Sequence, residues 1–337
     1  GSRSATAGAP ARAGRHGFSH PSCNPNSSRF PETAIACPRG GPPLYHQIHP
    51  RFAPRDIAVL YLHIGLHKTG TTYLQSVVFR RWRGIRYVQN LTVENFLRID
   101  PAETVLASRE GFSGPALAHQ AEKLAFLRRL SRMFPDARIL IGFRPHASYI
   151  NALYSQYLRY GGTRVLPEFF DMETDRGVLT QTDVLFRPYI EAIREYWGRA
   201  PFVFLLGEIM NQPARLADDL GALLGTEPPA FDSATHGSRN ASLGALQAET
   251  LRRLNRACGV RLHRDSRTRP YRVLRRLSLD PPRLCQRWSA LVKGRPTMST
   301  AMAERIGQHY QADWDFVREC AERRRSDEAP RTARTDT

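Results

Sequence analysis

A short stretch of the sequence, residues 63–72, combines the residue types that bind an anion. It follows an apolar run at residues 57–64 and leads into a segment with helical character. Its glycines allow tight turns, so that amides near the helix start point at one spot, where the helix dipole adds partial positive charge. Lys68 brings a full charge, and threonines at the helix start supply hydroxyl donors. The predicted anion-binding loop therefore has as donors Lys68, Thr69, Gly70, Thr71 and Thr72.

Lys68 is unusual for this chain, because three of its 49 basic residues are lysines and the others are arginines. A compact ammonium group is thus favoured at this position. The spacing differs from the Walker A motif, in which lysine follows the second glycine and a Ser or Thr binds magnesium. Here Lys68 precedes Gly70, and Thr71 takes the place of that lysine. The pattern counts against a P-loop kinase.

A second strand-to-helix junction carries an arginine. Residues 138–143 form a β-rich apolar run, Arg144 and Pro145 follow, and residues 146–160 have the pattern of a helix that ends at two glycines. An arginine at such a junction can bind a phosphate group through two parallel hydrogen bonds. Pairing of Arg144 with a surface carboxylate is the alternative.

These two segments resemble those of sulfotransferases that use 3′-phosphoadenosine 5′-phosphosulfate (PAPS), in particular the carbohydrate sulfotransferases and their bacterial relatives. The stretch HIGLHKTGTTYLQ is similar to the family's 5′-phosphosulfate-binding loop. The resemblance implies that the loop, with Lys68, Thr71 and Thr72, holds the 5′-phosphosulfate. Lys68 would also neutralise the bridging oxygen as the product 3′-phosphoadenosine 5′-phosphate (PAP) leaves. Arg144 would bind the 3′-phosphate. The similarity extends over roughly residues 57 to 257.

The sequence departs from the family pattern at one phosphate ligand. In the family, a serine about eight residues after the arginine shares the 3′-phosphate, and an ungapped match places Ala152 there. Ser148 and Ser155 lie one helical turn to either side and are the candidates to replace it. Residues 236–243 resemble the loop that closes over the nucleotide, which makes Arg239 a further donor-binding candidate.

Sulfuryl transfer requires alignment, charge neutralisation and a base for the incoming hydroxyl. Family members use a glutamate or a histidine. Glu110 follows a candidate strand and is expected to face the ligand; a salt bridge to Arg109 or to another arginine is the alternative. His67, inside the loop, is the rival base, whereas His63, within the apolar strand, is expected to be a core histidine. No residue spacing indicates a metal site.

Strand and helix patterns alternate, which predicts an α/β fold with a P-loop-like parallel sheet flanked by helices on both faces. The resemblance implies the sulfotransferase fold in particular. In such sheets a ligand lies at the carboxyl ends of the strands. The expected strands are residues 57–64, 104–107, 138–143 and 201–206, and the expected helices are residues 71–81, a segment opened by Pro115, 146–160 and 183–197.

Composition divides the chain into three parts. Residues 1–55 are rich in Gly, Pro, Ser, Ala and Arg without apolar periodicity and are expected to be disordered, as is the tail 323–337. One domain is expected over residues 56–322, and its last part, about 251–322, is predicted to be basic and helical.

The formal net charge of +18 should attract polyanions, anionic lipid or a phosphate-bearing substrate. An anionic glycan or glycolipid is the favoured acceptor. The basic residues 251–295 are interpreted either as a solvated basic face or as a patch that contacts the acceptor, a membrane or a polyanion, and no specific nucleic acid is expected as a partner. Five cysteines without metal or disulfide spacing, and no signal-peptide or membrane-spanning pattern, favour the cytoplasm.

Two other functions stay open at this stage. A P-loop kinase of a small metabolite would need an acidic residue that holds magnesium, and Glu208 is the candidate. A catalytically weak polyanion-binding protein on the same fold is favoured by Ala152 at the serine position.

Overall fold

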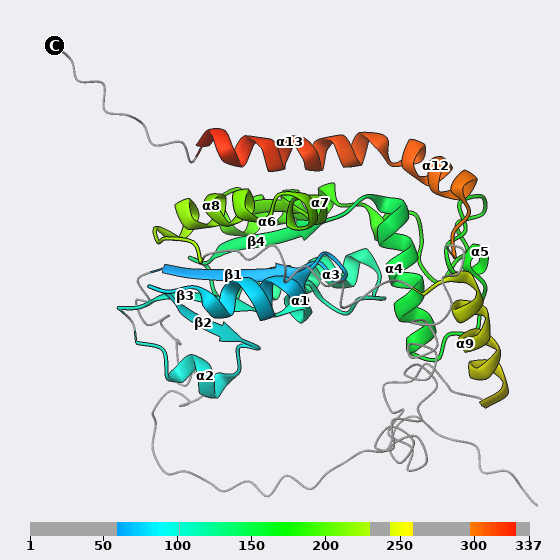
Figure 1. The fold of residues 1–337 in the computed structure, drawn as a ribbon, viewed down its shortest axis with the longest axis horizontal. Helices are drawn as coiled ribbons and strands as arrows, with labels where there is room; N and C mark the ends of the chain where they lie inside the picture. The colour runs from blue at the N-terminus through cyan, green and yellow to red at the C-terminus, as the bar shows by residue number, and fades with distance from the viewer. Residues whose placement is uncertain (1–58, 101, 230–242, 259–296, 328–337) are drawn as a thin grey trace, which may run out of the picture. The chain divides into compact units, whose positions relative to one another are not determined.

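The strand predicted at residues 57–64 is the middle strand of a parallel sheet. The computed structural model describes residues 59–100, 102–229, 243–258 and 297–327, all within the unit Phe52–Thr337. These residues form the strands β1 (Val59–Gly65), β2 (Arg86–Gln89), β3 (Thr104–Ser108), β4 (Arg138–Phe143) and β5 (Phe202–Leu205). The strand order is β2-β3-β1-β4-β5, and every neighbouring pair is parallel (Figure 1). The predicted parallel α/β architecture is confirmed.

Helices connect the strands and continue beyond the sheet. After β1 comes a helical run over residues 71–81, built from α1 (Thr71–Tyr73), a π turn (Leu74–Val78) and a 3-10 turn (Phe79–Arg81). Two further 3-10 turns are Glu110–Ser113 and Thr182–Val184. The other α-helices of the described residues are α2 (Val93–Leu97), α3 (Gln120–Met133), α4 (His146–Arg159), α5 (Leu166–Phe169), α6 (Arg187–Trp197), α7 (Leu206–Asn211), α8 (Pro213–Leu224), α9 (Ala245–Cys258), α12 (Thr300–His309) and α13 (Gln311–Asp327).

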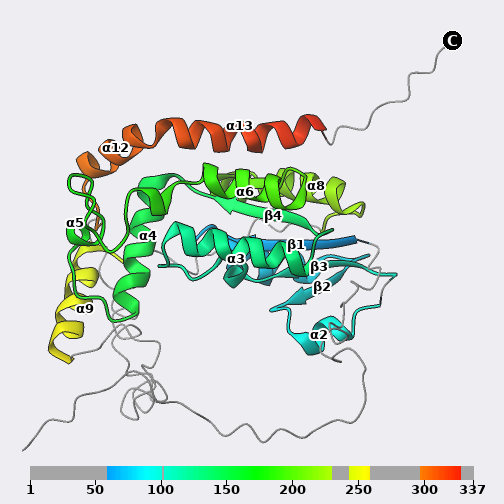
Figure 2. The same ribbon diagram turned by 180° about the vertical axis from the view of Figure 1, so that it is seen from behind.

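Alternate residues of β1 pack into two separate cores. Leu60, Leu62 and Ile64 are buried on one face with residues of α3, α4 and α6. Tyr61 is buried on the other face with the helical run after β1 and with α7 and α8. Successive side chains of a strand point to opposite faces, so a strand covered on both faces is apolar at nearly every position. Figures 1 and 2 show these helices on both sides of the sheet.

Helix α3 begins at Gln120, later than the start predicted at Pro115. The carboxylate of Asp183 accepts a hydrogen bond from the Gln120 amide (2.7 Å) and contacts Nδ1 of His119 (2.8 Å). A carboxylate at a helix N-terminus satisfies a free amide and interacts favourably with the helix dipole. Because Asp183 is distant in the sequence, the local pattern around Pro115 does not reveal this boundary.

Helix α13 continues to Asp327, past Arg323, where composition placed the start of a tail. The side chain of Arg324 points inward and is buried. Its guanidinium hydrogen-bonds to a carbonyl of β5 and to the carboxylates of Glu208 (2.8 Å) and Asp219 (2.9 Å). Contacts with β5, α7 and α8 therefore extend the helix beyond the boundary that composition indicated.

Candidate functional site

The predicted anion-binding loop joins the end of β1 to α1. Its backbone is left-handed at Gly65 and Gly70, where φ is 88°, and at Lys68, where φ is 67°. Glycine adopts such angles readily, whereas other residues rarely do. A Cβ atom at Gly70 would lie 2.7 Å from Cδ1 of Ile209 in α7, so that the Ile209 side chain would have to shift. The positive φ favours glycine at position 70, and the missing side chain lets α7 pack closely against the loop.

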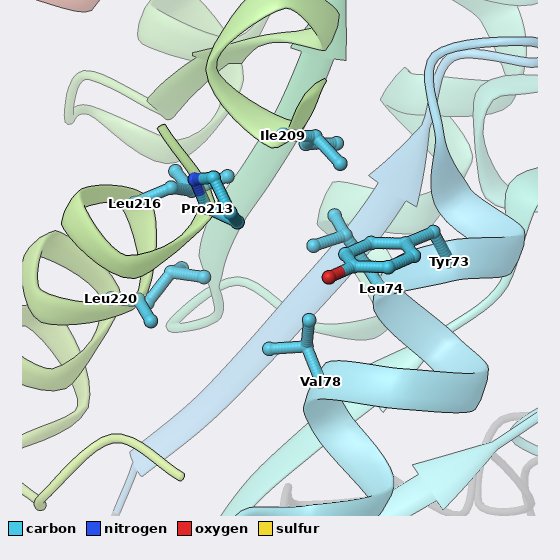
Figure 3. Close-up of a pocket in the computed structure, with 8 residues that line it drawn as sticks. Tyr73, Leu74, Val78, Ile209, Pro213, Leu216 and Leu220 are labelled. Carbon is cyan, nitrogen blue, oxygen red and sulfur yellow. The ribbon is translucent and has the colours of Figure 1, made fainter. Parts of the chain in front are cut away.

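Helices α7 and α8 hold the helical run after the loop from one side. Figure 3 shows the apolar side chains that meet there, Tyr73, Leu74 and Val78 on one side and Ile209, Pro213, Leu216 and Leu220 on the other. The cavity between them measures about 10 Å³. A cavity needs roughly 10–15 Å³ to hold a single water molecule. This seam therefore holds the helical run in place and leaves room for about one water molecule.

Six consecutive amides of the loop, those of residues 67–72, have no hydrogen-bond acceptor among the described residues. Leu66, just before them, donates to the carbonyl of Gly142 (3.3 Å). Tyr73, just after them, donates to the carbonyl of Gly70 (2.9 Å). Backbone amides are normally paired in folded proteins, and a run of free amides at a helix start is an established way to bind phosphate or sulfate.

The three threonines of the loop use their hydroxyls differently. Thr69 is buried and donates to the carbonyl of Leu66 (2.6 Å), so that its side chain closes the loop. The hydroxyl of Thr71 is buried and has no partner among the described residues. The side chain of Thr72 is exposed. A buried hydroxyl without a partner is unfavourable, and an anionic ligand could supply the missing contact at Thr71.

Lys68 stands in surroundings that are mainly positive. Burial lowers the pKa of its ammonium group, and the nearby charges of Arg159 and Arg144 lower it further, while Glu110 acts in the opposite direction. An anion bound between these cations would remove part of their mutual repulsion.

Arg144 reaches the loop from the end of β4. Its Nη1 atom donates to the backbone carbonyl of Lys68 (2.9 Å), and its Nε atom donates to the hydroxyl of Ser148 (2.8 Å). The structure thus brings together the two segments that the sequence identified separately. Pairing of Arg144 with a surface carboxylate, the alternative, is absent from its contacts with the described residues.

The structure distinguishes between the two serines that flank Ala152. Ser155 is buried, donates to the carbonyl of Asn151 (3.1 Å) and accepts from the amide of Leu243 (3.2 Å). Ser148 accepts from Nε of Arg144 (2.8 Å) and donates to the carbonyl of Pro145 (2.8 Å). Because it contacts Arg144, Ser148 is the better placed of the two to share an anion with the arginine.

The two candidate bases, His67 and Glu110, lie next to each other. Nδ1 of His67 is 3.3 Å from Oε2 of Glu110, and its Nε2 atom is 2.9 Å from the carbonyl oxygen of Gly114. Both ring nitrogens thus face acceptors, and each contact is a hydrogen bond only when the nitrogen that makes it carries a proton. The two side chains are 19% and 36% exposed, so that the pair can be reached from solvent.

The carboxyl group of Glu110 responds to two opposing influences. Burial acts to raise its pKa, but the hydrogen bond and charge of His67 and the charge of Lys68 outweigh that effect. The net result is a pKa below the usual value. Glu110 is therefore ionised at neutral pH. Among the described residues, the ion pair of Glu110 is with His67 and not with Arg109 or another arginine, the alternative partners.

A buried polar layer beneath the loop contains a residue that sequence reasoning missed. Nδ1 of His63 lies 2.7 Å from the hydroxyl of Ser108, which also accepts a hydrogen bond from Gln75 (2.9 Å). Burial lowers the pKa of His63 to about 4, so that this histidine is neutral and belongs to the core, as expected. Gln75 connects the helical run to the end of β3. The sequence could have indicated it only as a polar residue on the inward face of an otherwise apolar helix.

Arg159 was also missed by sequence reasoning. It ends α4, and its charge acts on Lys68. In the sequence it is one arginine among many, which hides its position near the loop.

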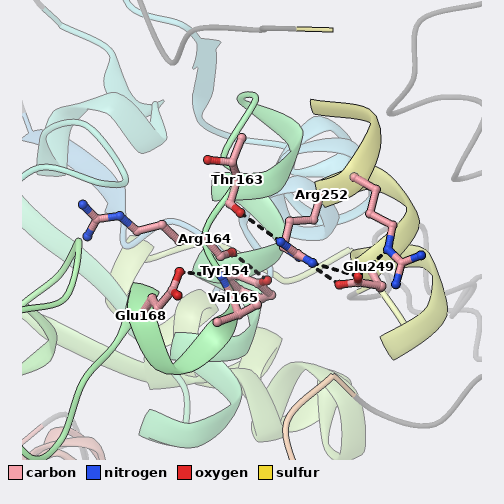
Figure 4. Close-up of polar contacts among 8 residues, drawn as sticks. Tyr154, Thr163, Arg164, Val165, Glu168, Glu249 and Arg252 are labelled. Atoms are coloured by element: carbon pink, nitrogen blue, oxygen red, sulfur yellow. Dashed lines mark hydrogen bonds and ion pairs between the residues drawn. The ribbon is translucent and has the colours of Figure 1, made fainter. Parts of the chain in front are cut away.

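Helix α9 fixes the chain that follows Arg159. Arg252 pairs with Glu249 (2.8 Å) and donates to the carbonyl of Thr163 (3.4 Å), as Figure 4 shows. The side-chain amide nitrogen of Asn255 donates to the backbone carbonyls of Leu158 and Gly162, both at 2.8 Å. These contacts anchor the turn after α4.

Some of the predictions fall on residues that the structure does not describe. Arg239, residues 1–55 and most of the basic stretch 251–295 lie outside the described residues. Within the described residues, no group of three or more His, Cys, Asp or Glu side chains is placed to hold a metal ion. In the same residues, no helix combines the length and apolar character needed to cross a membrane.

Comparison with known proteins gives one similar structure. No family model and no curated protein matches this chain. Among solved structures, the chain is similar to a sulfotransferase from Alicyclobacillus acidocaldarius, with a TM-score of 0.39 and 15% sequence identity. The match covers 53% of this chain and 87% of that chain. The activity of the chain is therefore inferred from its own residues.

Proposed function

We propose that this chain is a sulfotransferase that transfers a sulfuryl group from PAPS to a hydroxyl of an acceptor. One observation carries the proposal: the six free amides of residues 67–72 lie beside Lys68, and Arg144 hydrogen-bonds to the same loop. Phosphosulfate is an anion with many acceptor oxygens and no donors, and this set of groups consists of donors and positive charges.

The donor contacts follow from this arrangement. The loop amides, with Lys68, Thr71 and Thr72, would hold the 5′-phosphosulfate, while Arg144 and Ser148 would hold the 3′-phosphate. The fit is supported by the unpaired buried hydroxyl of Thr71. As the bond between sulfur and the bridging oxygen breaks, negative charge grows on PAP, and the ammonium of Lys68 stabilises it.

Glu110 is the proposed base, and His67 positions it. The acceptor hydroxyl transfers its proton to the ionised carboxylate as its oxygen forms the new bond to sulfur. His67 would act as the base instead if it gave up a ring proton, and it would then lose its contact with Gly114 or with Glu110. The geometry favours Glu110 for that reason. No step needs a metal ion in this scheme.

An anionic glycan or glycolipid is the proposed acceptor class. Lys68, Arg144 and Arg159 give the loop region a positive field, which raises the local concentration of anionic molecules. Contact of the basic stretch 251–295 with a membrane or polyanion is part of the same proposal. A reducing compartment, the cytoplasm, is proposed from cysteine usage, and the buried Cys320 is a free thiol.

The kinase alternative loses its metal-binding candidate. Glu208 hydrogen-bonds to Arg324 (2.8 Å) and accepts from the amide of Leu205 (2.7 Å), so that its carboxylate is already engaged. A polyanion-binding protein without catalysis is the remaining alternative, since Ala152 stands where the resemblance implies a serine.

Calorimetry with PAP, ATP and heparin tests the three functions. We expect PAP to bind without magnesium and a radiolabelled sulfuryl group to pass from PAPS to a glycan or lipid acceptor. Binding of ATP that depends on magnesium would favour the kinase. Binding of heparin alone, strongly weakened by salt, would favour the polyanion-binding protein. Absence of PAP binding would refute the proposed function.

A further inference from the structure

The start of α4 is held by the C-terminal helices. His146, the first residue of α4, has a buried ring that stacks on the ring of Tyr310, with 4.5 Å between the ring centroids and an interplanar angle of 4°. The ring centroid of Phe186 lies 4.2 Å from that of His146, and the ring of Trp314 contacts it edge-on with 6.3 Å between centroids. Tyr310 ends α12 and Trp314 belongs to α13. The first residue of α4 therefore packs against Phe186 and against two residues that follow it by more than a hundred positions.

One carboxylate completes this packing. Oδ2 of Asp313, in α13, lies 2.9 Å from Nε2 of His146 and accepts from the amide of Phe186 (2.8 Å). Oδ1 accepts from the amide of Arg187 (2.9 Å) at the start of α6. Asp313 thus links α4, α6 and α13 at a single buried point. Figures 1 and 2 show α12 near α4 and α13 running on from it along α6 and α8.

The same turn of α4 positions Arg144, the residue proposed to bind the 3′-phosphate. Arg144 precedes His146 by two residues, and Ser148 follows it by two. The guanidinium of Arg144 contacts both the hydroxyl of Ser148 and the carbonyl of Lys68. A shift or rotation at His146 would move this guanidinium away from the loop, because Pro145 restricts the backbone between them.

We infer that Asp313, acting through His146, is a positioning residue for Arg144, so that the C-terminal helices set the affinity for a 3′-phosphate without touching the nucleotide. The inference rests on the proposed function. It extends that function to α12 and α13, which would not contact the nucleotide themselves but would affect how tightly its 3′-phosphate binds.

The test compares PAP with 5′-AMP, which lacks the 3′-phosphate, by titration calorimetry on the full chain. In Asp313→Asn we expect the affinity for PAP to fall about tenfold and the affinity for AMP to change less than twofold. The matched control is Asp315→Asn, because Asp315 lies on the same helix, is exposed and contacts Gln311 and Arg318. This control should change neither affinity.

Two further variants separate positioning from general loss of structure. In an Arg144→Ala background, Asp313→Asn should leave the ratio of PAP to AMP affinity unchanged, because its effect passes through Arg144. His146→Gln keeps a donor for Asp313 but loses the ring stack. It should lower the ratio of PAP to AMP affinity, and it replaces Asp313→Asn as the test variant if Asp313→Asn does not fold.

Equal losses of PAP and AMP affinity in Asp313→Asn, or an undiminished effect in the Arg144→Ala background, would overturn the inference and leave the proposed function standing. A wild-type chain that binds neither nucleotide would overturn the proposed function, and the inference with it.

Discussion

The cations at the loop and the arginine that fastens α13 have opposite surroundings. Arg324 is buried and meets the carboxylates of both Glu208 and Asp219. Lys68 is affected by Arg159 more strongly than by Glu110, so that repulsion exceeds attraction around it. Burial of a charge is unfavourable unless the charge is paired. The proposed function explains this contrast: Lys68 would gain an anionic partner when the donor binds, whereas Arg324 already has its partners within the fold.

The largest expected effect tests the loop half of this comparison. If the proposed function holds, Lys68→Ala should lower kcat/KM for sulfuryl transfer by about 10³-fold, because it removes the charge proposed to stabilise the departing PAP oxygen. Its thermal stability should equal or exceed that of the wild type, since repulsion with Arg159 and Arg144 is relieved. Steady-state kinetics and calorimetric unfolding measure the two quantities. Turnover like that of the wild type would remove Lys68 from the mechanism.

Arg324→Met tests the structural half. Removing the guanidinium leaves two carboxylates without their partner, and the free energy of unfolding should fall by about 3–5 kcal/mol. The control is Arg323→Met, because Arg323 forms an exposed pair with Glu319, worth less than about 1 kcal/mol. Denaturant unfolding measures both variants. If Arg324→Met lost no more stability than the control, the assignment of Arg324 to structure would be wrong.

Glu110→Gln should lower kcat by about 10²-fold, because a general base contributes roughly that much or more. In the wild type, the base is active when deprotonated. Since its pKa is lowered, the acid limb of the pH–rate profile should lie below the usual glutamate value of about 4.3. Glu103→Gln, at an exposed ion pair with Arg86, is the control. Activity and an acid limb that both persist unchanged in Glu110→Gln would show that Glu110 is not the base and leave His67 as the candidate.

Lys123 supplies the smallest and sharpest test, because it is a buried cation outside the loop. Its ammonium has no hydrogen-bond partner among the described residues, and burial lowers its pKa from 10.5 to about 8. The folded state therefore disfavours the charged form of Lys123. The resulting loss of stability is fully present below pH 8 and disappears as the pH rises toward 10.5.

Lys123→Met should thus raise the free energy of unfolding at pH 7 by about 2 kcal/mol. The gain over the wild type should shrink between pH 8 and 10.5. Unfolding measured across that range checks the prediction. A variant that is less stable than the wild type at pH 7 would show that Lys123 has a compensating partner.

The sequence by itself determined the local parts of this protein. Strand β4 matches its predicted range, and Gly70, Lys68 and Arg144 stand where short-range patterns placed them. Such features depend on neighbouring residues: apolar runs form buried strands, and glycine is needed where φ is positive.

The tertiary structure decided which distant residues meet. It brought Arg144 to the carbonyl of Lys68, joined His67 to Glu110 and placed Ser148 beside the arginine. It also carried Asp313 to the first turn of α4. A charged side chain has no periodic signal that identifies its partner, because the pairing depends on how the helices pack over the sheet. The sequence therefore identifies the side chains that can bind an anion, and the packing of the helices over the sheet determines which of them are in contact.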